Sequence, residues 1–381
     1  MAGIYIHIPY CKQACTYCDF HFSTAMNTRS EMVPALVKEL SGRQAEIKEE
    51  IASIYFGGGT PSLLEPDELA RIFDAIQAHF KVANNAEITL EANPDDLSVF
   101  KLNAWMRLGV NRLSIGIQSF HDADLIWMNR AHTASEAQNA VDRARDAGFN
   151  NLTVDLIYGL PQWAGGEWEA NLERLLALQV PHFSAYILTV EDRTVLGRNV
   201  AKGKQRLADD AAIAEQYARL CFSASSAGYA HYEVSNFALP QAMAQHNAAY
   251  WTGRPYLGIG PGAHSFDGHI RRWNVSSNRG YVQAMATNRS FSESETLTAL
   301  DRHNEQLLTG LRTARGIALN DFAQLGSPAA HPDSQHEWTK LLAAGDLTLQ
   351  PDGRYRIPES RWLFADQIAG SLFVVDHDLN A

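Results

Sequence analysis

Apolar positions in the first 230 residues form six short runs, and longer segments with apolar residues at every third or fourth position separate them. Short apolar runs predict strands, and the longer spacing predicts amphipathic helices. The predicted strands cover residues 4–8, 51–56, 86–90, 112–117, 151–157 and 182–188. The predicted helices cover residues 29–49, 66–80, 97–108, 135–147, 167–178 and 208–227. This alternation predicts an α/β fold with a parallel sheet, favouring an incomplete (β/α)6 TIM-like barrel over a doubly wound open sheet.

The pattern changes after residue 240. Residues 241–295 are rich in aromatic residues and glycine, and we expect them to form a connecting region between residues 1–240 and residues 296–381. In the last part, helices are predicted at residues 297–313, 320–325, 335–344 and 361–374, with a hairpin at residues 347–357. Pro351-Asp352-Gly353 supplies the turn of this hairpin. We therefore expect a smaller C-terminal α+β domain that resembles a winged helix.

Charge and composition limit the function of the chain. The net charge is −11 over 381 residues, and residues 297–381 alone combine 7 Lys/Arg with 11 Asp/Glu. Phosphate backbones attract the opposite sign, so nucleic acid is excluded as a partner, despite the winged-helix resemblance. No run of eighteen apolar residues indicates a transmembrane helix. The N-terminus lacks the basic segment of a signal peptide, and we expect a cytoplasmic protein.

Three cysteines follow the first predicted strand. Cys11, Cys15 and Cys18 have the spacing C-x3-C-x2-C, which lets three thiolates converge from one loop. Structural zinc normally takes four protein ligands, whereas three thiolates leave one iron of a [4Fe–4S] cluster open. A zinc loop with a distant fourth ligand and simple packing are the alternatives. The fourth cysteine, Cys221, lies in a helical pattern and is interpreted as a small buried hydrophobe. The motif resembles that of the radical S-adenosylmethionine (SAM) superfamily, in which SAM chelates the open iron.

Polar residues follow the other predicted strands, where a barrel of this type carries its active residues. Residues 57–61 read Gly-Gly-Gly-Thr-Pro, and three glycines allow backbone to approach a ligand closely. Glu91 ends the third strand and suits a ribose diol, and Gln118 ends the fourth. Arg130 is a candidate partner for a ligand carboxylate. Asp155 stands inside an apolar strand, where a carboxylate is costly unless it is satisfied.

The order of these motifs resembles the oxygen-independent coproporphyrinogen III dehydrogenase group. The resemblance implies that Cys11, Cys15 and Cys18 hold the cluster. It further implies contacts to SAM from nine residues: Tyr5, Tyr17, Gly58 and Glu91, and, matching positions around a second SAM, Gly59, Thr60, Gln118, Arg130 and Asp155. Two departures count against the dehydrogenase activity. The dehydrogenase motif continues to a fourth cysteine, whereas Cys18 is followed here by Asp19-Phe20, and only ten residues precede Cys11 where the dehydrogenase has an extension.

Residues 246–251 read His-Asn-Ala-Ala-Tyr-Trp. Together with the cysteine motif, this sequence resembles the HemW-type haem chaperones. Imidazole is a common axial haem ligand, and Tyr250 and Trp251 offer flat apolar faces to a macrocycle. The resemblance implies haem bound through His246, Tyr250 and Trp251. The alternative is that His246 bonds a loop and that Tyr250 and Trp251 pack under it. The other histidines that compete as haem ligands are His7, His21, His231 and His264. Arg271 and Arg272 are candidate partners for haem propionates.

The sequence thus predicts a haem chaperone that carries a SAM-coordinated [4Fe–4S] cluster. Its expected recipients are apo-haemoproteins, in particular respiratory enzymes of membranes. The alternative from a different class is a radical SAM enzyme that oxidises coproporphyrinogen III. A haem-degrading methyltransferase is the third interpretation.

Overall fold

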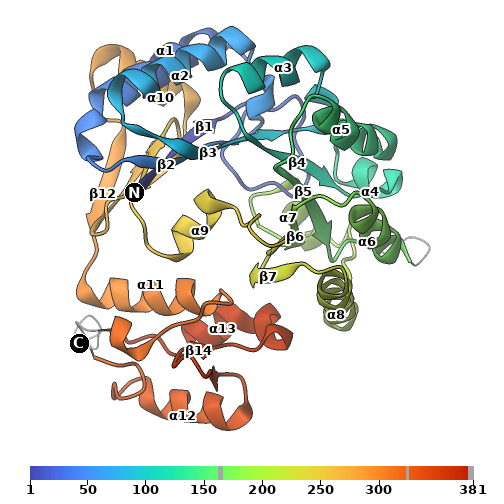
Figure 1. Ribbon diagram of the computed structural model, residues 1–381, viewed down its shortest axis with the longest axis vertical. Coiled ribbons are helices and arrows are strands. Elements are labelled where there is room, and N and C mark those ends of the chain that lie inside the picture. Colours follow the sequence, from blue (N-terminus) through green and yellow to red (C-terminus); the bar gives the residue numbers. More distant parts are fainter. Residues whose placement is uncertain (162–165, 323–325, 376–381) are drawn as a thin grey trace.

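Six parallel strands in chain order form the centre of the molecule (Figure 1). The computed structural model describes residues 1–161, 166–322 and 326–375. The central strands are β1 (Ala2–Ile8), β2 (Ile51–Gly58), β3 (Val82–Ala92), β4 (Arg112–Gln118), β5 (Leu152–Tyr158) and β6 (His182–Ile187). Each strand pairs in parallel with the next along the chain. This order is that of an incomplete barrel, so the predicted fold class is confirmed and the doubly wound alternative is wrong.

Short strands that the sequence did not predict extend the sheet at both edges. Beside β1, the sheet continues through β9 (Tyr256–Ile259), β10 (His264–Phe266), β11 (Ile270–Asn274) and β12 (Ser292–Thr296). Beside β6 it continues through β8 (Asn236–Ala238) and β7 (Ala230–Glu233). β9 runs parallel to β1, and the remaining added strands pair antiparallel. Residues 241–295 therefore add strands to the main sheet, and the division of the chain at residues 240 and 295 stays a prediction.

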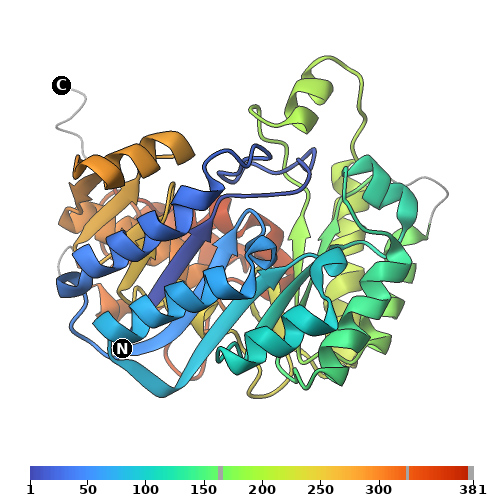
Figure 2. The ribbon, with the colours of Figure 1, turned by 90° about the horizontal axis from the view of Figure 1, so that it is seen from above.

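Helices cover the outer face of the sheet (Figures 1 and 2). The predicted ones are α1 (Arg29–Gly42), α2 (Pro66–His79), α3 (Val99–Arg107), α5 (Ala134–Asp146), α6 (Glu167–Ala177) and α8 (Asp210–Ser226). The structure adds α4 (Asp122–Trp127), α7 (Val195–Ala201), α9 (Gln245–Trp251) and α10 (Asn278–Thr287), with the 3-10 turns η1 (Gln44–Glu46), η2 (Pro61–Leu63) and η3 (Pro94–Asp96). The first helix ends at Gly42 and not at residue 49. Arg43 there pairs with both Glu39 and Glu46, which fixes the turn η1.

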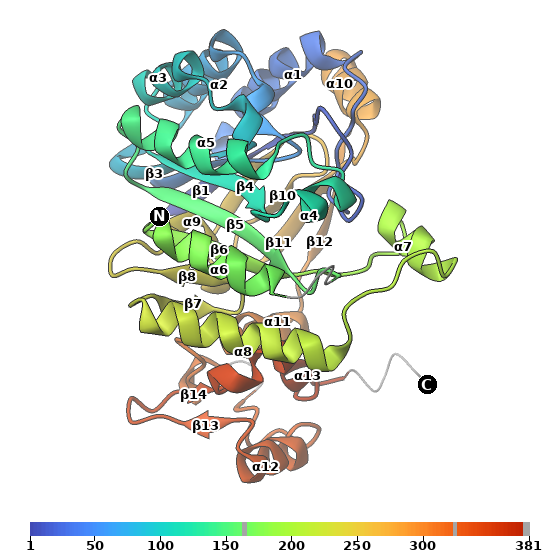
Figure 3. The same cartoon turned by 90° about the vertical axis from the view of Figure 1, so that its right-hand side faces the viewer.

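The last part of the chain packs below the barrel in Figures 1 and 3, and α9 lies between the two in Figure 1. It contains α11 (Ala299–Leu311), η4 (Leu319–Asp321), α12 (Gln335–Ala344), β13 (Thr348–Leu349), β14 (Tyr355–Arg356), η5 (Glu359–Phe364) and α13 (Ala365–Gly370). β13 and β14 form the predicted antiparallel hairpin. The helix expected at residues 320–325 corresponds to η4 and in part lies outside the described residues. The expected last helix is divided into η5 and α13.

Apolar side chains from the barrel and from the C-terminal region belong to one continuous core, which includes Ile6, Phe183 and Trp362. In the part of the chain that the structure describes, no helix is long and apolar enough to cross a membrane.

Candidate functional site

The cysteine loop follows β1 and lies at the carboxyl ends of the parallel strands. The Cys11 amide donates to the Ser23 carbonyl (3.1 Å), which closes the loop on itself. Asn129 Nδ2 donates to the Ala14 carbonyl (2.7 Å), which ties the loop to the segment after β4. Asn129 adopts a left-handed backbone (φ 58°). The segment that carries Arg130 thus fixes the middle of the cysteine loop.

The three thiols are partly buried and close enough to influence one another. Burial, with a smaller contribution from the neighbouring cysteines, raises the pKa of Cys11 to about 11 and that of Cys18 to about 12. Thr60 Oγ1 donates to Cys11 Sγ (3.4 Å), and Arg130 Nη1 donates to Cys15 Sγ (3.4 Å). Three sulfur donors, assisted by a hydroxyl and a cation, fit an iron–sulfur cluster, whose binding would displace the thiol protons.

Other groups closely approach the three glycines at the end of β2, Gly57 to Gly59, and leave no room for a side chain. A Cβ on Gly57 would meet the rings of Tyr5 and Tyr55 at 2.9 Å. Gly58 has φ +110°, and a Cβ there would meet the His7 ring at 2.7 Å. A Cβ on Gly59 would meet the backbone of the cysteine loop, 2.7 Å from the Tyr10 carbonyl oxygen. The turn therefore lets β2 and the cysteine loop lie against one another.

The carboxylates of Glu91 and Asp155 lie close enough inside the barrel to influence each other. Burial raises the pKa of Glu91 to about 7, and the charge of Asp155 contributes to this rise. The Tyr55 hydroxyl, which donates to Glu91 Oε1 (2.7 Å), acts in the opposite direction. Burial also raises the pKa of Asp155, whereas hydrogen bonds from Ser184 and Ser114 lower it. Ser114 Oγ lies 3.1 Å from Asp155 Oδ2. The carboxylate that the sequence marked as costly thus accepts a hydrogen bond from the Ser114 hydroxyl.

Gln118 and Arg130 contribute buried polar atoms that have no hydrogen-bond partner among the described residues: Gln118 Oε1 and Arg130 Nε. Gln118 adopts φ 71°, a strained backbone for a residue other than glycine. Arg130 Nη2 donates to Asn93 Oδ1 and to the Gly116 carbonyl, both at 2.7 Å. Unpaired buried atoms are costly, so this corner of the site suits a polar ligand.

Of the two tyrosines expected at SAM, Tyr5 lies in β1 and Tyr17 lies in the cysteine loop itself, between Cys15 and Cys18. Burial raises the pKa of Tyr17, which lies beside Cys15, Cys18 and Arg130. His7 Nε2 lies 2.8 Å from the His21 carbonyl, so it carries the proton, and His7 Nδ1 accepts from the Tyr5 hydroxyl (3.1 Å). All nine residues expected to contact SAM therefore lie in the region around the cysteine loop and the strand ends.

The segment His246–Trp251 forms most of α9, on the inner side of the barrel. His246 is buried with 3 % of its surface exposed, and both of its ring nitrogens are in hydrogen bonds. Nδ1 lies 2.8 Å from Ser53 Oγ, and Nε2 lies 3.0 Å from Tyr250 Oη. Burial lowers the pKa of His246 to about 3, so the imidazole is neutral. In this arrangement His246 orients Tyr250 and presents no free nitrogen to a ligand.

A cavity of about 950 Å³ lies between α9 and the C-terminal region. Tyr250 and Trp251 line one side, and Trp251 Nε1 is buried with no hydrogen-bond partner in the described residues. The lining holds two carboxylates, Glu305 and Asp321, and it includes five arginines: Arg254, Arg271, Arg302, Arg315 and Arg354. The sequence suggested only Arg271 among these, because the other four are scattered over segments that meet only in the folded chain. This pocket is locally basic in a protein of net charge −11.

Known proteins resemble this chain in sequence and in fold. Residues 5–175 match the radical SAM superfamily. A protein of Lactococcus lactis named heme chaperone HemW is 35 % identical over 84 % of this chain and 83 % of its own. The Bacillus subtilis protein of that name is 34 % identical over 85 % of this chain and 86 % of its own. Coproporphyrinogen III oxidase (HemN) of Escherichia coli, described as a radical SAM enzyme, has a similar fold, with a TM-score of 0.83, 20 % identity, and coverage of 98 % of this chain and 90 % of that one.

The HemN likeness supports the fold alone, whereas the HemW relatives match most of both chains at more than 30 % identity. Together with the cysteine loop and the α9 sequence, these similarities show that the chain belongs to the HemW family of the radical SAM superfamily.

Proposed function

We propose that this protein is a haem chaperone, which binds haem in the arginine-lined pocket and transfers it to apo-haemoproteins. The pocket beside α9 carries this proposal, because it combines aromatic walls with a basic lining in an acidic protein. Its volume of about 950 Å³ is at the upper end of small-molecule sites, which suits a large flat ligand. The relatives named heme chaperone HemW support the same function.

The cysteine loop would hold a [4Fe–4S] cluster through Cys11, Cys15 and Cys18. When bound, the cluster supplies a redox-active iron that the amino and carboxylate groups of SAM chelate. We assign Arg130 to the SAM carboxylate, since its guanidinium already lies against Cys15. The unpaired Gln118 Oε1 would accept from the SAM amine. Glu91 would accept from the ribose diol, and Asp155, whose charge raises the pKa of Glu91, would also contact SAM.

Haem would lie with its macrocycle against Tyr250 and Trp251 and with its propionates toward the arginines. Arg254 and Arg315 are the best candidates for the propionates. Both are exposed at the pocket, and neither side chain makes a hydrogen bond or ion pair within the described part of the chain. Arg271 and Arg354, by contrast, already pair with carboxylates. His246 would act by positioning Tyr250, through the bond between Nε2 and the phenol oxygen.

The recipients would be haem-requiring apo-proteins, including respiratory enzymes of membranes. We place the protein in the cytoplasm, because thiols that assemble an oxygen-sensitive cluster require a reducing compartment.

An anaerobic haem titration of the cluster-loaded protein, followed by the Soret band, tests the proposal. We expect a saturable band at about one haem per chain. The double substitution Arg254→Gln/Arg315→Gln should raise the Kd about tenfold, which corresponds to ~1.4 kcal/mol of lost charge-assisted bonding. Arg71→Gln/Arg107→Gln is the matched control, because both arginines are exposed on helices remote from the pocket.

Two results would contradict the proposal: no saturable band in the parent protein, or the same Kd in the pocket variant and the control. Turnover of coproporphyrinogen III by the cluster-loaded protein would favour the porphyrinogen-oxidising alternative. Methyl transfer from SAM to haem with ring opening would favour the methyltransferase.

A further inference from the structure

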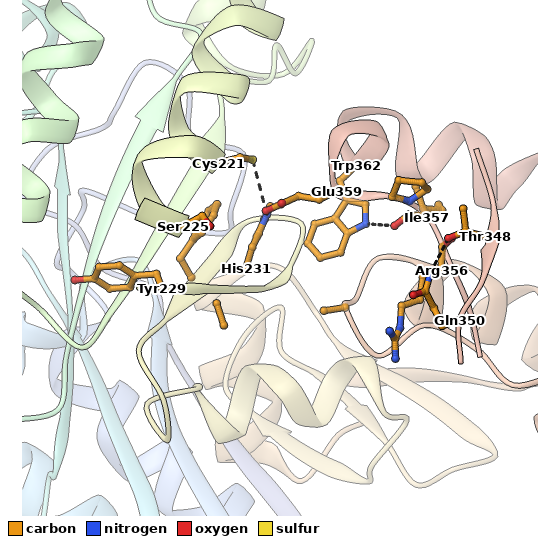
Figure 4. Close-up of a pocket in the computed structure, with 14 residues that line it drawn as sticks. Cys221, Ser225, Tyr229, His231, Thr348, Gln350, Arg356, Ile357, Glu359 and Trp362 are labelled. Carbon is orange, nitrogen blue, oxygen red and sulfur yellow. Dashed lines mark hydrogen bonds and ion pairs between the residues drawn. The ribbon is translucent and has the colours of Figure 1, made fainter. Parts of the chain in front are cut away.

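A second group of metal-ligating side chains lies far along the chain from the cysteine loop. Cys221 of α8, His231 of β7 and Glu359 of η5 each place one ligand atom within 4.8 Å of the other two (Figure 4). His231 Nδ1 lies 2.7 Å from Glu359 Oε1 and 3.9 Å from Cys221 Sγ. Sulfur, imidazole nitrogen and carboxylate oxygen thus converge from three elements on one point.

We propose that these three residues bind a divalent transition-metal ion, with zinc as the best match. Thiolate, imidazole and carboxylate are the three ligand types that zinc takes in proteins. A thiolate and a carboxylate together balance the two positive charges of the ion, so the completed site is neutral. Three protein ligands leave a fourth position of the tetrahedron for water or another small ligand.

The orientation of the His231 ring supports this proposal. Nε2 lies 3.2 Å from the Val234 carbonyl and donates its proton there, which directs the lone pair of Nδ1 toward Cys221 and Glu359. A backbone carbonyl on the second nitrogen is the usual support of a metal-bound histidine. The ring also stacks on Phe237, with centroids 3.9 Å apart, and meets the edge of Trp362 at 4.4 Å. The imidazole is therefore fixed before any ion arrives.

The same geometry argues against a nucleophilic triad. In a Cys-His-acid triad the thiol and the carboxylate contact opposite nitrogens of the imidazole, so that the acid orients the base. Here both groups face Nδ1, and the backbone occupies Nε2. Without an ion, Nδ1 and Glu359 Oε1 lie 2.7 Å apart in a hydrogen bond, whose proton occupies the place that the ion would take.

A cavity of about 470 Å³ adjoins the three ligands and gives room for a fourth one. Ser225 and Gln350 are among its lining residues. Tyr217 Oη donates to the Glu359 carbonyl (3.0 Å), which fixes η5 against α8. Since Cys221 and His231 belong to the barrel and Glu359 to the C-terminal region, the ion would join the two parts of the chain.

Zinc content after equilibrium dialysis tests the site in the full-length, cluster-loaded protein. The loaded cluster occupies the loop thiols, and iron analysis of each sample verifies this. We expect about one zinc per chain in the parent protein. Cys221→Ser and His231→Gln should each weaken binding by about 100-fold or more, and Glu359→Gln by about tenfold. Ser225→Ala is the matched control, since Ser225 lines the same cavity but is not one of the three residues whose ligand atoms converge, and it should bind zinc like the parent.

Cobalt provides a second measurement that does not depend on the folding of one variant. In a chain whose three loop cysteines are replaced by alanine, Co²⁺ should give a thiolate charge-transfer band, and the additional substitution Cys221→Ser should abolish it. Glu359 is half exposed, so Glu359→Gln should fold even if the two buried variants do not. The proposal is overturned if the parent holds less than about a tenth of an equivalent of zinc, or if Cys221→Ser and Glu359→Gln retain parental affinity.

Discussion

Arg130 is the residue that connects the cysteine loop with the strand ends. Its guanidinium donates to Cys15 Sγ, to Asn93 and to the Gly116 carbonyl, and the residue is partly buried. A buried cation with several acceptors is costly to remove, because its partners are left unpaired. We therefore interpret Arg130 as both a structural and a ligand-binding residue, which a lone arginine in a sequence cannot reveal.

Replacing any cysteine of the loop should abolish the iron–sulfur cluster. Cys11→Ser, Cys15→Ser or Cys18→Ser removes one of three thiolates from a centre that has no fourth protein thiolate nearby. Iron should fall from about four per chain to less than one, and the visible iron–sulfur absorption should disappear. Cys221→Ser is the control, and it should keep the full iron content. A triple variant that still assembled the cluster would contradict the assignment.

Glu91 should make the stability of the protein depend on pH. Burial raises its pKa in the folded state to about 7, above the ordinary value of 4.5. Between these values the unfolded chain has released a proton that the folded chain keeps, so the free energy of unfolding falls as pH rises from 4.5 to 7. The loss that Glu91 contributes is up to about 3 kcal/mol.

Denaturant unfolding of the metal-free parent protein and of Glu91→Gln, at pH 5 and pH 7.5, measures this contribution. The variant cannot ionise, so its difference from the parent should change between the two values of pH. Parallel stability curves for the two proteins would show that Glu91 titrates normally in the folded state.

At the scale of elements, the glycines at the end of β2 allow the sheet and the cysteine loop to pack closely together. Gly58→Ala combines a left-handed backbone with a Cβ 2.7 Å from the His7 ring, and it should cost about 2–3 kcal/mol of folding free energy. Gly42→Ala is the control. Nothing lies within 4 Å of its added Cβ at the end of α1, and it should be neutral or stabilising by up to about 1 kcal/mol. Chemical denaturation measures both, and equal effects would contradict the role of the turn.

The elements that could be predicted from the sequence are those with a long, regular pattern. The six parallel strands are mostly buried, so each contains a short run that is largely apolar. β8 and β10 lie in the extensions of the sheet beyond the six parallel strands. They have three residues each, so their pattern is too short to detect. α9 has seven residues, too few for a helical repeat to be detected, and the sequence predicted a connecting region there.

The candidate site follows the same rule. The cysteine loop and the strand-end residues are local motifs, so the sequence could indicate them before the structure was known. The arginines of the pocket come from five separate positions between residues 254 and 354, and only folding brings them together. The sequence indicates Cys221 only as a small hydrophobe in a helical pattern, because the residues that meet it are distant in the chain. His231 is 10 residues from Cys221, and Glu359 is 128 residues from His231.

At the scale of the whole molecule, aromatic side chains connect the cysteine-loop region with the haem pocket. Tyr5 stacks on Tyr55, which in turn stacks on His246 with centroids 5.1 Å apart. His246 meets the edge of Tyr250, which meets the edge of Tyr256, with centroids 5.1 Å and 4.7 Å apart. These rings form a continuous packed path from the pocket to Tyr55, whose hydroxyl donates to Glu91.

The charge distribution of the whole molecule predicts a salt dependence of haem binding. The pocket is basic, but the rest of the acidic protein repels an anionic ligand over distances that salt screens. Salt also screens the direct attraction between the haem propionates and the exposed arginines, and at short range this attraction outweighs the repulsion. We therefore expect the Kd for haem to rise severalfold between 50 mM and 500 mM salt, and less steeply in Arg254→Gln/Arg315→Gln. Soret titrations at several ionic strengths measure this, and identical slopes in both proteins would exclude the arginines as propionate partners.

The pairing of β1 with β9 has a consequence for biosynthesis. β1 lies between β2 and β9, so its second neighbour, Tyr256–Ile259, leaves the ribosome long after the cysteine loop. At ordinary translation rates of about 5–20 residues per second, roughly 12–48 s pass between synthesis of the cysteine loop and synthesis of β9. During this interval the nascent thiols are accessible to oxidants and to cluster donors alike. The chain order therefore gives the cell a period in which cluster insertion competes with thiol oxidation, before synthesis of the barrel is complete.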